Sequence, residues 1–329
     1  MREIDFTAVM ERLCDLTPRQ RRTLVEALTT TTVMAEVVGT INARVAEHPH
    51  CPHCGGAALQ KWGQSLGVQR FRCKGCRKTF NALTGTPLAR LRHREAWSAY
   101  GEALRDGLSI RKAAAKCGVH YTTTFRWRHR WLQCPRDQKD ESFAGIVEAD
   151  ETFFLESHKG SKAWARTNQG KLTEPPPGRK PRHRGGKAKK RGLSAEQVAV
   201  IVIRDRHGAT TDAVLGNLSK ASVTPVLKPI LNKDTLLCTD GAAFYKAAAK
   251  AEGFAHQPLN VKAGTRVKER VFHIQNVNAY HERLKGWMHR FRGVATKYLP
   301  NYLGWRRMVE RQGDAESVSP FQVMAAALA

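Results

Sequence analysis

Two groups of residues in this chain have the types and spacing needed for chemistry. The first is a set of four thiols, in which Cys51-Pro-His-Cys54 is followed by Cys73-Lys-Gly-Cys76. Two Cys-x-x-Cys pairs at this separation suit one tetrahedral zinc ion, because each pair delivers two thiolates and the intervening hairpin brings the pairs together. Four thiolates leave no open coordination position, so we expect one structural Zn²⁺. The alternative is four unrelated thiols or a redox pair.

The second group consists of carboxylates placed inside or directly after apolar segments. Glu148, Asp150 and Glu151 interrupt a strand-like run, and Asp240 follows a later one. Buried acids are costly unless they are paired or bind a cation. Two carboxylates from adjacent strands can hold Mg²⁺ or Mn²⁺, and two such ions would activate an attacking oxygen and stabilise a departing one. Strand alternation puts Glu148 on the face of Asp150, where we expect it to support that residue; an edge strand with acids facing water is the competing interpretation.

The overall composition indicates a polyanionic partner. The 329 residues include 55 lysines and arginines against 29 acids, which gives a formal charge of +26. Such an excess favours nucleic acid as the partner. We find no amphipathic basic helix, no lipid anchor and no apolar run long enough to span a bilayer, so no membrane partner is expected. The first residues do not resemble a secretory signal, and the sparse cysteines favour a reducing compartment.

Residues 92 to 133 have the pattern of a helix, a turn and a second helix. Ser109 suits a helix N-cap and Gly118 suits the turn. The last helix starts with small polar residues followed by arginines, which suits major-groove and phosphate contacts. Phe125 in this helix is expected to face the core, and a plain helical packing unit is the alternative to DNA binding. The residues assigned to DNA are Thr122, Thr123, Arg126, Arg128 and Arg130.

Two other segments are less regular. Residues 1–47 predict a small helical segment, in which the threonines Thr29 to Thr32 argue against one unbroken helix. Residues 157–192 are rich in lysine and arginine and contain three consecutive prolines and several glycines, which precludes a packed core. We expect this basic flexible insertion to order on a nucleic-acid backbone; a linker without function is the alternative. Its assigned DNA-binding residues are Lys187, Lys189, Lys190 and Arg191.

The chain returns to strands and helices after the insertion. Gln197 to Arg204 suits a central strand with a hairpin partner after it. A helix, a strand ending near Asp240 and further helices follow, and the last long helix carries Asn278 and Lys285 on or near one face. His273, near the start of the segment that we expect to form this helix, is expected near the site or as a capping or packing residue. This order of elements is that of a ribonuclease-H-like fold.

Several motifs, taken in order, resemble the insertion-sequence transposases of the ISXO-like group, of the DDE type. They are the zinc ribbon, the helix-turn-helix, ADETFF around Asp150, CTDGAAFY around Asp240 and HIQNVNAYHERLK in the last long helix. The resemblance extends from Cys51 to about Met308 and includes the basic insertion.

The resemblance implies a set of site residues. Asp150 and Asp240 would be the catalytic acids, and the third position falls on Asn278, followed by Lys285, as in an Asp-Asp-Asn-Lys variant of the group. An amide oxygen can ligate Mg²⁺ but brings no negative charge and cannot act as a base, so two Mg²⁺ or Mn²⁺ ions would depend mainly on the aspartates. Glu282 is a rival third ligand, or else an exposed partner of a neighbouring basic residue. Lys285 has the reach to touch a DNA phosphate.

The expected fold is multidomain, with a zinc ribbon and a helix-turn-helix followed by an α/β ribonuclease-H-like catalytic domain. The predicted boundaries are 1–47 for the N-terminal helical segment, 48–84 for the zinc ribbon, 85–135 for the helix-turn-helix, 143–310 for the catalytic domain and 311–329 for a C-terminal tail.

The resemblance further implies a DNA transposase that binds terminal inverted repeats in double-stranded DNA. It would hydrolyse the strand at the element end and transfer the 3′ hydroxyl to target DNA. Pairing two ends implies a homo-oligomer, and the setting would be the bacterial cytoplasm, associated with the nucleoid. The alternatives are a zinc-dependent DNA-binding protein with an inactive nuclease core and a metal-dependent nuclease without strand transfer.

Overall fold

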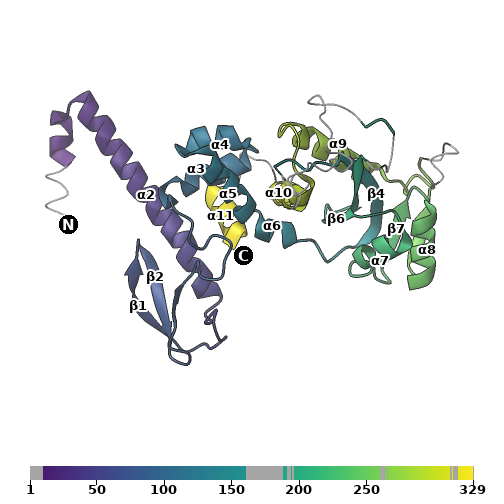
Figure 1. Ribbon diagram of the computed structural model, residues 1–329, viewed down its shortest axis with the longest axis horizontal. Helices are drawn as coiled ribbons and strands as arrows, with labels where there is room; N and C mark the ends of the chain where they lie inside the picture. The colour runs from purple at the N-terminus through teal and green to yellow at the C-terminus, as the bar shows by residue number, and fades with distance from the viewer. Residues whose placement is uncertain are drawn as a thin grey trace, which may run out of the picture. The chain divides into compact units, whose positions relative to one another are not determined.

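The chain folds into two units in the computed structural model, which describes residues 10–160, 188–190, 194, 196–259, 264, 266–311, 313 and 318–328 (Figure 1). The first unit comprises Met1–Trp131 with Ala315–Ala329, and the second comprises Leu132–Asp314. The segment expected to be a C-terminal tail therefore contributes to the first unit. Its helix α11 (Pro320–Leu328) buries Val323 and Met324 and packs against α3 (Trp97–Arg105).

The first unit begins with one long helix, α2 (Pro18–Glu47), preceded by the short 3-10 turn η1 (Arg12–Asp15). A capping box starts α2, because the Thr17 side chain accepts from the Gln20 N–H and the Gln20 side chain accepts from the Thr17 N–H. The expectation of a break at the four threonines is wrong. A threonine costs about half a kcal/mol or more relative to alanine in a helix, and burial of residues such as Val37 in the second half of α2 offsets that cost.

The cysteine-rich segment forms a small antiparallel sheet. Its strands, β1 (Leu59–Ser65), β2 (Val68–Cys73) and β3 (Thr79–Asn81), pair in the order β1-β2-β3. The rings of Phe71 and Phe80 stack with their centroids 5.7 Å apart. Together with the buried thiols they form the core of this segment.

The predicted helix-turn-helix is present, with α3 followed by α4 (Ile110–Cys117) and α5 (Tyr121–Trp131). The Ser109 side chain accepts from the Lys112 N–H at 3.4 Å, and Gly118 ends α4 with a left-handed φ of 63°. Both turn residues therefore act as the sequence predicted. Phe125 is 45% exposed, so the expectation that it faces the core is wrong.

Aromatic rings fill the core between α3 and α5. Trp97, Tyr100, Trp127 and Trp131 are all buried, and Tyr100 meets both tryptophans of α5 edge to face. Edge-to-face pairs add about 0.5–1.5 kcal/mol each to the burial of the rings. The core thus fixes which face of α5 points outward.

A five-stranded mixed sheet forms the centre of the second unit. The strands are β4 (Gly145–Leu155), β5 (Gln197–Asp205), β6 (Thr210–Leu215), β7 (Thr235–Thr239) and β8 (Ala255–Pro258), and their order is β6-β5-β4-β7-β8. β4, β5 and β6 are antiparallel neighbours, whereas β7 is parallel to β4, and β8 is parallel to β7. The chain therefore makes a hairpin series first and then crosses to the other side of β4 through a helix. The order of hairpin strands, helix, strand and helix is the one that the sequence predicted.

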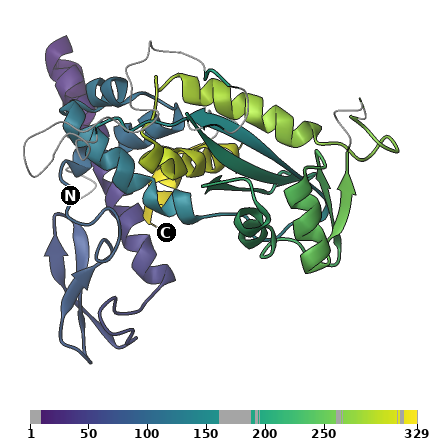
Figure 2. The same cartoon turned by 45° about the vertical axis from the view of Figure 1, so that its right-hand side comes forward.

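Helices cover the two faces of this sheet (Figure 2). α7 (Lys220–Leu227) and α8 (Ala243–Glu252) pack with Val147 and Ala149 of β4 in the main apolar core. α9 (Gln275–His289) lies on the opposite face, against β4 and β5. Because side chains alternate along a strand, β4 directs Glu148, Asp150 and Thr152 toward α9 and its odd-numbered neighbours toward α7 and α8.

The last helix of the second unit, α10 (Leu299–Arg311), packs against the short helix α6 (Gln133–Asp137). Gly304 permits this approach, because a Cβ there would lie 2.4 Å from the carbonyl oxygen of Pro135. Arg307 is buried and pairs with Asp212 of β6. The short 3-10 turns η2 (Arg94–Ala96) and η5 (Thr296–Tyr298) precede α3 and α10.

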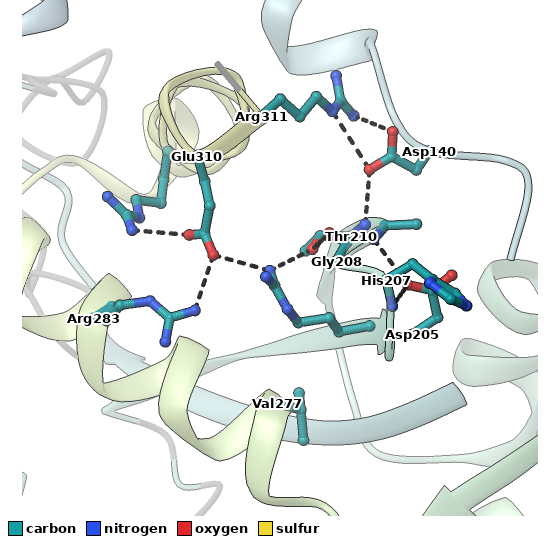
Figure 3. A network of polar contacts seen from close by, with 12 residues as sticks. Asp140, Asp205, His207, Gly208, Thr210, Val277, Arg283, Glu310 and Arg311 are labelled. Atoms are coloured by element: carbon teal, nitrogen blue, oxygen red, sulfur yellow. Dashed lines mark hydrogen bonds and ion pairs between the residues drawn. The ribbon is translucent and has the colours of Figure 1, made fainter. Parts of the chain in front are cut away.

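A network of ion pairs joins α10 to its neighbours in the second unit (Figure 3). Glu310 pairs with Arg283 of α9 at 2.9 Å and with Arg204 of β5 at 3.0 Å. Arg311 pairs with Asp140 at 3.0 Å, and Asp140 also accepts from the Thr210 N–H at 2.7 Å. Burial opposes ionisation of Glu310, but the hydrogen bond from Arg283 and the surrounding arginines hold its pKa below the usual value. This network helps to fix α9 relative to the sheet.

Candidate active site and nucleic-acid interface

The parallel strands β4 and β7 bring two of the predicted acids, Asp150 and Asp240, together at the carboxyl end of β7, which we call the sheet edge. β4 pairs with β7 so that Glu148 lies opposite Cys238. Continuing this register by two residues places Asp150 beside Asp240, which directly follows β7. Asp240 is exposed, and its Oδ1 accepts from the Ala242 N–H at 2.9 Å.

The electrostatics of Asp150 agree with this placement. Its side chain is 20% exposed. Burial raises the pKa of Asp150 to about 6; the carboxylate of Asp240 adds to the rise, while the Glu151 N–H and the Lys285 ammonium oppose it. Two carboxylates that repel each other in a partly buried site are more readily ionised when a cation lies between them.

Helix α9 presents one face to this acid pair. The Nδ1 atom of His281 lies 3.8 Å from Oδ2 of Asp150. Asn278 precedes His281 by three residues and Lys285 follows it by four, so all three share one side of the helix. Asp240 and Lys285 both shift the pKa of Asp150, so these three predicted residues lie near one another. Helical spacing puts the exposed Asn278 on the same side of α9 as Lys285.

His281 is a site residue that the sequence reasoning missed. It is buried, and its Nε2 atom has no hydrogen-bond partner among the described residues. Burial, together with the charge of Lys285, lowers the pKa of His281 to about 4, so the ring is neutral beside Asp150 at neutral pH. The signal that could have found it is its spacing of three from Asn278 and four from Lys285 on an amphipathic helix.

Glu282 lies farther from the acid pair around the helix than Asn278. Its side chain is 82% exposed, and its Oε1 atom lies 4.0 Å from Nζ of Lys285. This is the exposed pairing that the sequence offered as the alternative to ligation. Asn278 therefore remains our assignment for the third position.

Glu151 points to the other face of β4. The Tyr245 hydroxyl of α8 donates a hydrogen bond to Glu151 Oε1. Burial raises the pKa of Glu151 to about 7, although the Tyr245 hydrogen bond opposes the rise, and the charges of Asp150 and Asp240 add to it. The sheet edge therefore carries three acids, of which Glu151 is held away from α9.

Glu148 holds the start of α9 and is not exposed at all. Its Oε2 accepts from the Val277 N–H at 2.9 Å, and its Oε1 accepts from the Asn276 side-chain amide at 3.0 Å. Arg206 pairs with Oε1 at 3.2 Å. A carboxylate at a helix N-terminus satisfies free N–H groups and interacts favourably with the helix dipole. Glu148 thus supports the face of α9 that meets Asp150.

His273 belongs to this support and not to the acid pair. Its Nδ1 lies 3.4 Å from Oε1 of Glu148, and its ring also contacts the Arg206 guanidinium. His273 Nδ1 further accepts from the Gln275 N–H at 3.2 Å, at the first residue of α9. Of the alternatives offered by the sequence, capping and packing describe its position.

The four predicted zinc ligands converge in the first unit. One ligand atom from each of Cys51, Cys54, Cys73 and Cys76 lies within 4.8 Å of all the others. The Sγ atoms of Cys51 and Cys76 are 3.7 Å apart, and those of Cys54 and Cys73 are 3.6 Å apart. Several hydrogen bonds, of which that from the Cys76 N–H contributes most, lower the pKa of Cys73 to about 7, which favours a thiolate. The cluster could hold a metal ion.

The residues of α5 assigned to DNA separate into two groups. Thr122 and Arg126 are exposed and Thr123 is partly exposed, so all three can reach a ligand. Arg128 is fully buried, donates to the Leu108 carbonyl at 2.8 Å and contacts the Tyr100 hydroxyl at 3.3 Å. Its assignment to DNA is therefore wrong, because the side chain points into the core.

Arg130 is also tied to the protein. It is partly buried, and its guanidinium donates to the carbonyl oxygens of Pro87 and Ala89. These bonds join α5 to the loop that precedes α3. We therefore correct its assignment from a DNA contact to a residue that holds this loop.

Only part of the basic insertion lies within the described residues. Lys189 and Lys190 are exposed, and the Lys189 N–H donates to Glu196 at 3.0 Å. Lys187 and Arg191 lie outside the described residues.

Residues 142–306 match the ISXO2-like transposase domain, and residues 102–137 match a homeodomain-like domain. The first match covers half of the chain, and this protein therefore belongs to the ISXO2-like transposase family. The second match contains α4 and α5, which confirms the predicted helix-turn-helix.

A relative in a mobile element is also similar to this chain. It is described as an uncharacterized protein in transposable element ISH50 of Halobacterium salinarum, and it is 26% identical over 258 residues, which cover 77% of this chain and 82% of the relative. Among solved structures, a chain in the crystal structure of a pre-cleavage Mos1 transpososome is similar over 69% of this chain and 80% of its own length. The identity is 13% and the TM-score is 0.22, which is too low to relate the two folds.

Within the described residues, we find no helix with the length and apolar character needed to cross a membrane.

Proposed function

We propose that this protein is a metal-dependent DNA transposase whose second unit cuts and joins DNA at the sheet edge that carries Asp150 and Asp240. The observation that carries the proposal is the parallel register that sets these two acids side by side beneath α9. Membership of the transposase family supports the reaction class. The strand order, with a hairpin series followed by crossovers, supports a ribonuclease-H-like catalytic fold.

The donor set fits Mg²⁺ or Mn²⁺. Asp150, Asp240 and the amide oxygen of Asn278 would hold the metal, for which two carboxylates and a neutral oxygen are suitable hard ligands. The raised pKa of Asp150 supports this, because burial and the neighbouring Asp240 disfavour its ionised form, which a bound cation would favour. When bound, two such ions would supply Lewis-acid stabilisation for in-line phosphoryl transfer.

The side chains of α9 would orient the DNA. Lys285 is 48% exposed on the helix face above the acids, where its ammonium can meet a phosphate near the scissile bond. Neutral His281 packs beside Asp150 and limits its rotation. Glu148, buried beneath the start of α9, keeps Asn278 in place over the acid pair. Strand hydrolysis and attack by the 3′ hydroxyl are both in-line transfers, so one site can serve both steps.

The first unit would recognise the ends of the element. We propose one structural Zn²⁺ at the cysteine cluster, because four thiolates complete a tetrahedral site. Thr122, Thr123 and Arg126 at the exposed side of α5 would meet DNA, which is supported by the homeodomain-like match. Transposition joins two element ends, so we propose that a homo-oligomer assembles on DNA, in the cytoplasm of the host cell and in association with its nucleoid.

Two other functions differ from this proposal in the products they give. A DNA-binding protein with an inactive core would bind element ends without cutting them, which the neutral Asn278 makes worth testing. A nuclease would cut without joining. The test incubates the purified full-length protein with Mg²⁺ and labelled DNA carrying the element's ends together with a target plasmid.

Joined products are expected from the unaltered protein. Asp150→Asn and Asp240→Asn should each lower cleavage about a thousandfold, since a metal site supplies several kcal/mol of transition-state stabilisation, while DNA binding is retained. Glu282→Gln is the matched control on α9 and should leave cleavage near its original rate. Unchanged cleavage by both aspartate variants would refute the proposed site, and cleavage without joined products would favour the nuclease.

A further inference from the structure

Two adjoining hollows in the first unit are lined by cations and by no carboxylate. One has a volume of about 630 Å³, and its charged lining residues are Arg90, Arg94, Arg126 and Arg130. The other, of about 690 Å³, shares Arg90 and Arg126, adds Arg92 and His93, and reaches Thr122 and Thr123 at the start of α5. A concave surface with several guanidinium groups and no acid concentrates positive potential and attracts anions.

Arg94 has no partner for its charge among the described residues. Its side chain is partly buried, and its NH1 atom has no hydrogen-bond partner there. Burial lowers the pKa of its guanidinium. The neighbouring carboxylate of Glu95 pairs with His93 at 3.1 Å and lines neither hollow. An anion bound in the first hollow would supply a partner for this donor.

The loop of residues 82–93, which carries Arg90 and Arg92 and leads into Arg94, is held in one conformation. The Arg130 guanidinium of α5 binds the carbonyl oxygens of Pro87 and Ala89, and Leu88 between them is fully buried. Arg90 has a left-handed φ of 60°, a conformation that is unfavourable for a residue with a Cβ. Such a conformation persists where the surrounding structure determines it. The cations are therefore fixed in place before any ligand arrives.

We propose that these two hollows receive the sugar–phosphate backbone of DNA, with Arg90 and Arg94 as phosphate contacts beside the groove that the start of α5 enters. This inference rests on the proposed DNA-binding function and specifies which groups hold the backbone. Arg126, which lines both hollows, joins the phosphate contacts to Thr122 and Thr123, which are placed to meet base edges. Phosphate contacts fix register without reading sequence, whereas base-edge contacts specify it.

The experiment measures DNA affinity of the zinc-loaded full-length protein by fluorescence anisotropy across a series of salt concentrations. One duplex carries the element end and the other an unrelated sequence. Arg94→Gln and Arg90→Gly should each weaken binding to both duplexes by the same factor. Each should also lower the slope of log K against log salt by about 1, the value for one lost phosphate contact. Arg22→Gln, an exposed arginine of α2 outside both hollows, is the matched control and should leave the slope unchanged.

Arg90→Gly separates binding from folding. Glycine adopts a left-handed φ without strain, so this variant should unfold at the same temperature or higher while it binds DNA more weakly. If Arg94→Gln and Arg90→Gly both show the same slope of log K against log salt as the original protein, the inference is overturned while the proposed function stays intact. Failure of the unaltered protein to bind either duplex would overturn both. A phosphate-induced rise in melting temperature that Arg94→Gln abolishes, with DNA affinity unchanged, would assign the hollows to free phosphate and also overturn it.

Discussion

The two units differ in the sign of the charge that they leave uncompensated. In the first unit, arginines line two hollows that contain no carboxylate. In the second, Asp150 and Asp240 repel each other at a sheet edge, and among the described residues the Lys285 ammonium lowers the pKa of Asp150. Around Glu310 of the same unit, by contrast, the charges are paired (Figure 3). Uncompensated charge thus marks the surfaces that await a ligand, and paired charge marks the scaffold.

The same contrast holds between residues two positions apart in one element. On β4, Glu148 is buried and bonded by α9, whereas Asp150 faces the open edge. On α5, Arg128 is buried among backbone and hydroxyl partners, whereas Arg126 is exposed. Residue type alone does not distinguish the members of each pair. Their partners do, and mutations that remove either member should have different consequences.

The largest expected effect is on the cysteine cluster. Cys54→Ser, or removal of zinc by a chelator, should unfold the β1–β3 segment, because structural zinc contributes about 10 kcal/mol or more to the folding of small zinc modules. Metal analysis should show loss of one zinc per chain, and DNA affinity should fall. Cys14→Ser, at an exposed thiol outside the cluster, is the control. Retained zinc stoichiometry in Cys54→Ser would contradict a site with four thiolates.

Removal of Glu148 should release the start of α9. Glu148→Ala leaves Arg206 and the Val277 N–H without their buried partner, and breaking a buried ion pair costs about 3–5 kcal/mol. Hydrogen–deuterium exchange of peptides from α9 should therefore accelerate, and Glu148→Gln, which can still accept a hydrogen bond, should show a smaller change. Glu282→Ala is the control, at an exposed position of the same helix. Unchanged exchange in Glu148→Ala would show that α9 is held by other contacts.

The acids at the sheet edge should make the free energy of unfolding depend on both pH and metal binding. The folded pKa of Asp150, about 6, exceeds its ordinary value of 3.8, and the difference corresponds to about 3 kcal/mol. Between these values the folded state holds more protons than the unfolded state, so the free energy of unfolding falls as pH rises. Glu151, whose folded pKa is raised to about 7, adds to this decrease in the free energy of unfolding and continues it to higher pH.

A bound divalent cation should relieve this repulsion. Mg²⁺ is therefore expected to raise the melting temperature more at about pH 7.5 than at about pH 5, below the raised pKa of the acids. Thermal denaturation with and without Mg²⁺ at both pH values measures the effect. Asp150→Asn should diminish the difference between the two pH values. An equal Mg²⁺ effect at both would argue against metal binding at this edge.

The smallest expected effects separate Arg126 from Arg128. Arg126→Gln should leave the melting temperature unchanged and lower the salt slope of DNA binding by about 1. Arg128→Gln should lower the stability of the first unit by about 1–3 kcal/mol, because the Leu108 carbonyl loses its donor. Thermal denaturation and anisotropy on the same samples distinguish them. A slope reduced equally by both variants would contradict the buried position of Arg128.

Local signals in the sequence predicted the elements well. Ser109 and Gly118 mark the ends of α4 through capping and left-handed φ, which depend on single residues. The apolar runs around Asp150 and Asp240 predicted strands that carry acids, and the structure pairs these strands, β4 and β7, in parallel. The four cysteines could be assigned to one site from the sequence, because their spacing is itself the signal for a metal site.

The errors arose where tertiary contacts decide. Helix α2 continues through Thr29–Thr32 because packing of its second half outweighs a modest propensity cost. The alternation of arginines in α5 does not reveal which one faces the Tyr100 and Leu108 side of the core. His281 was missed because its neighbour across space, Asp150, lies on a strand far away in the sequence.

Helix α11 has a consequence for synthesis of the protein on the ribosome. It buries Val323 and Met324 in the first unit, and Gly101 of α3 lies so close to Pro320 that a Cβ would be 2.5 Å from its carbonyl oxygen. Helix α11 thus completes the first unit although it follows the whole second unit in the chain. A nascent chain must therefore make the second unit before the first can close, so a chain that terminates before α11 leaves α3 without this packing.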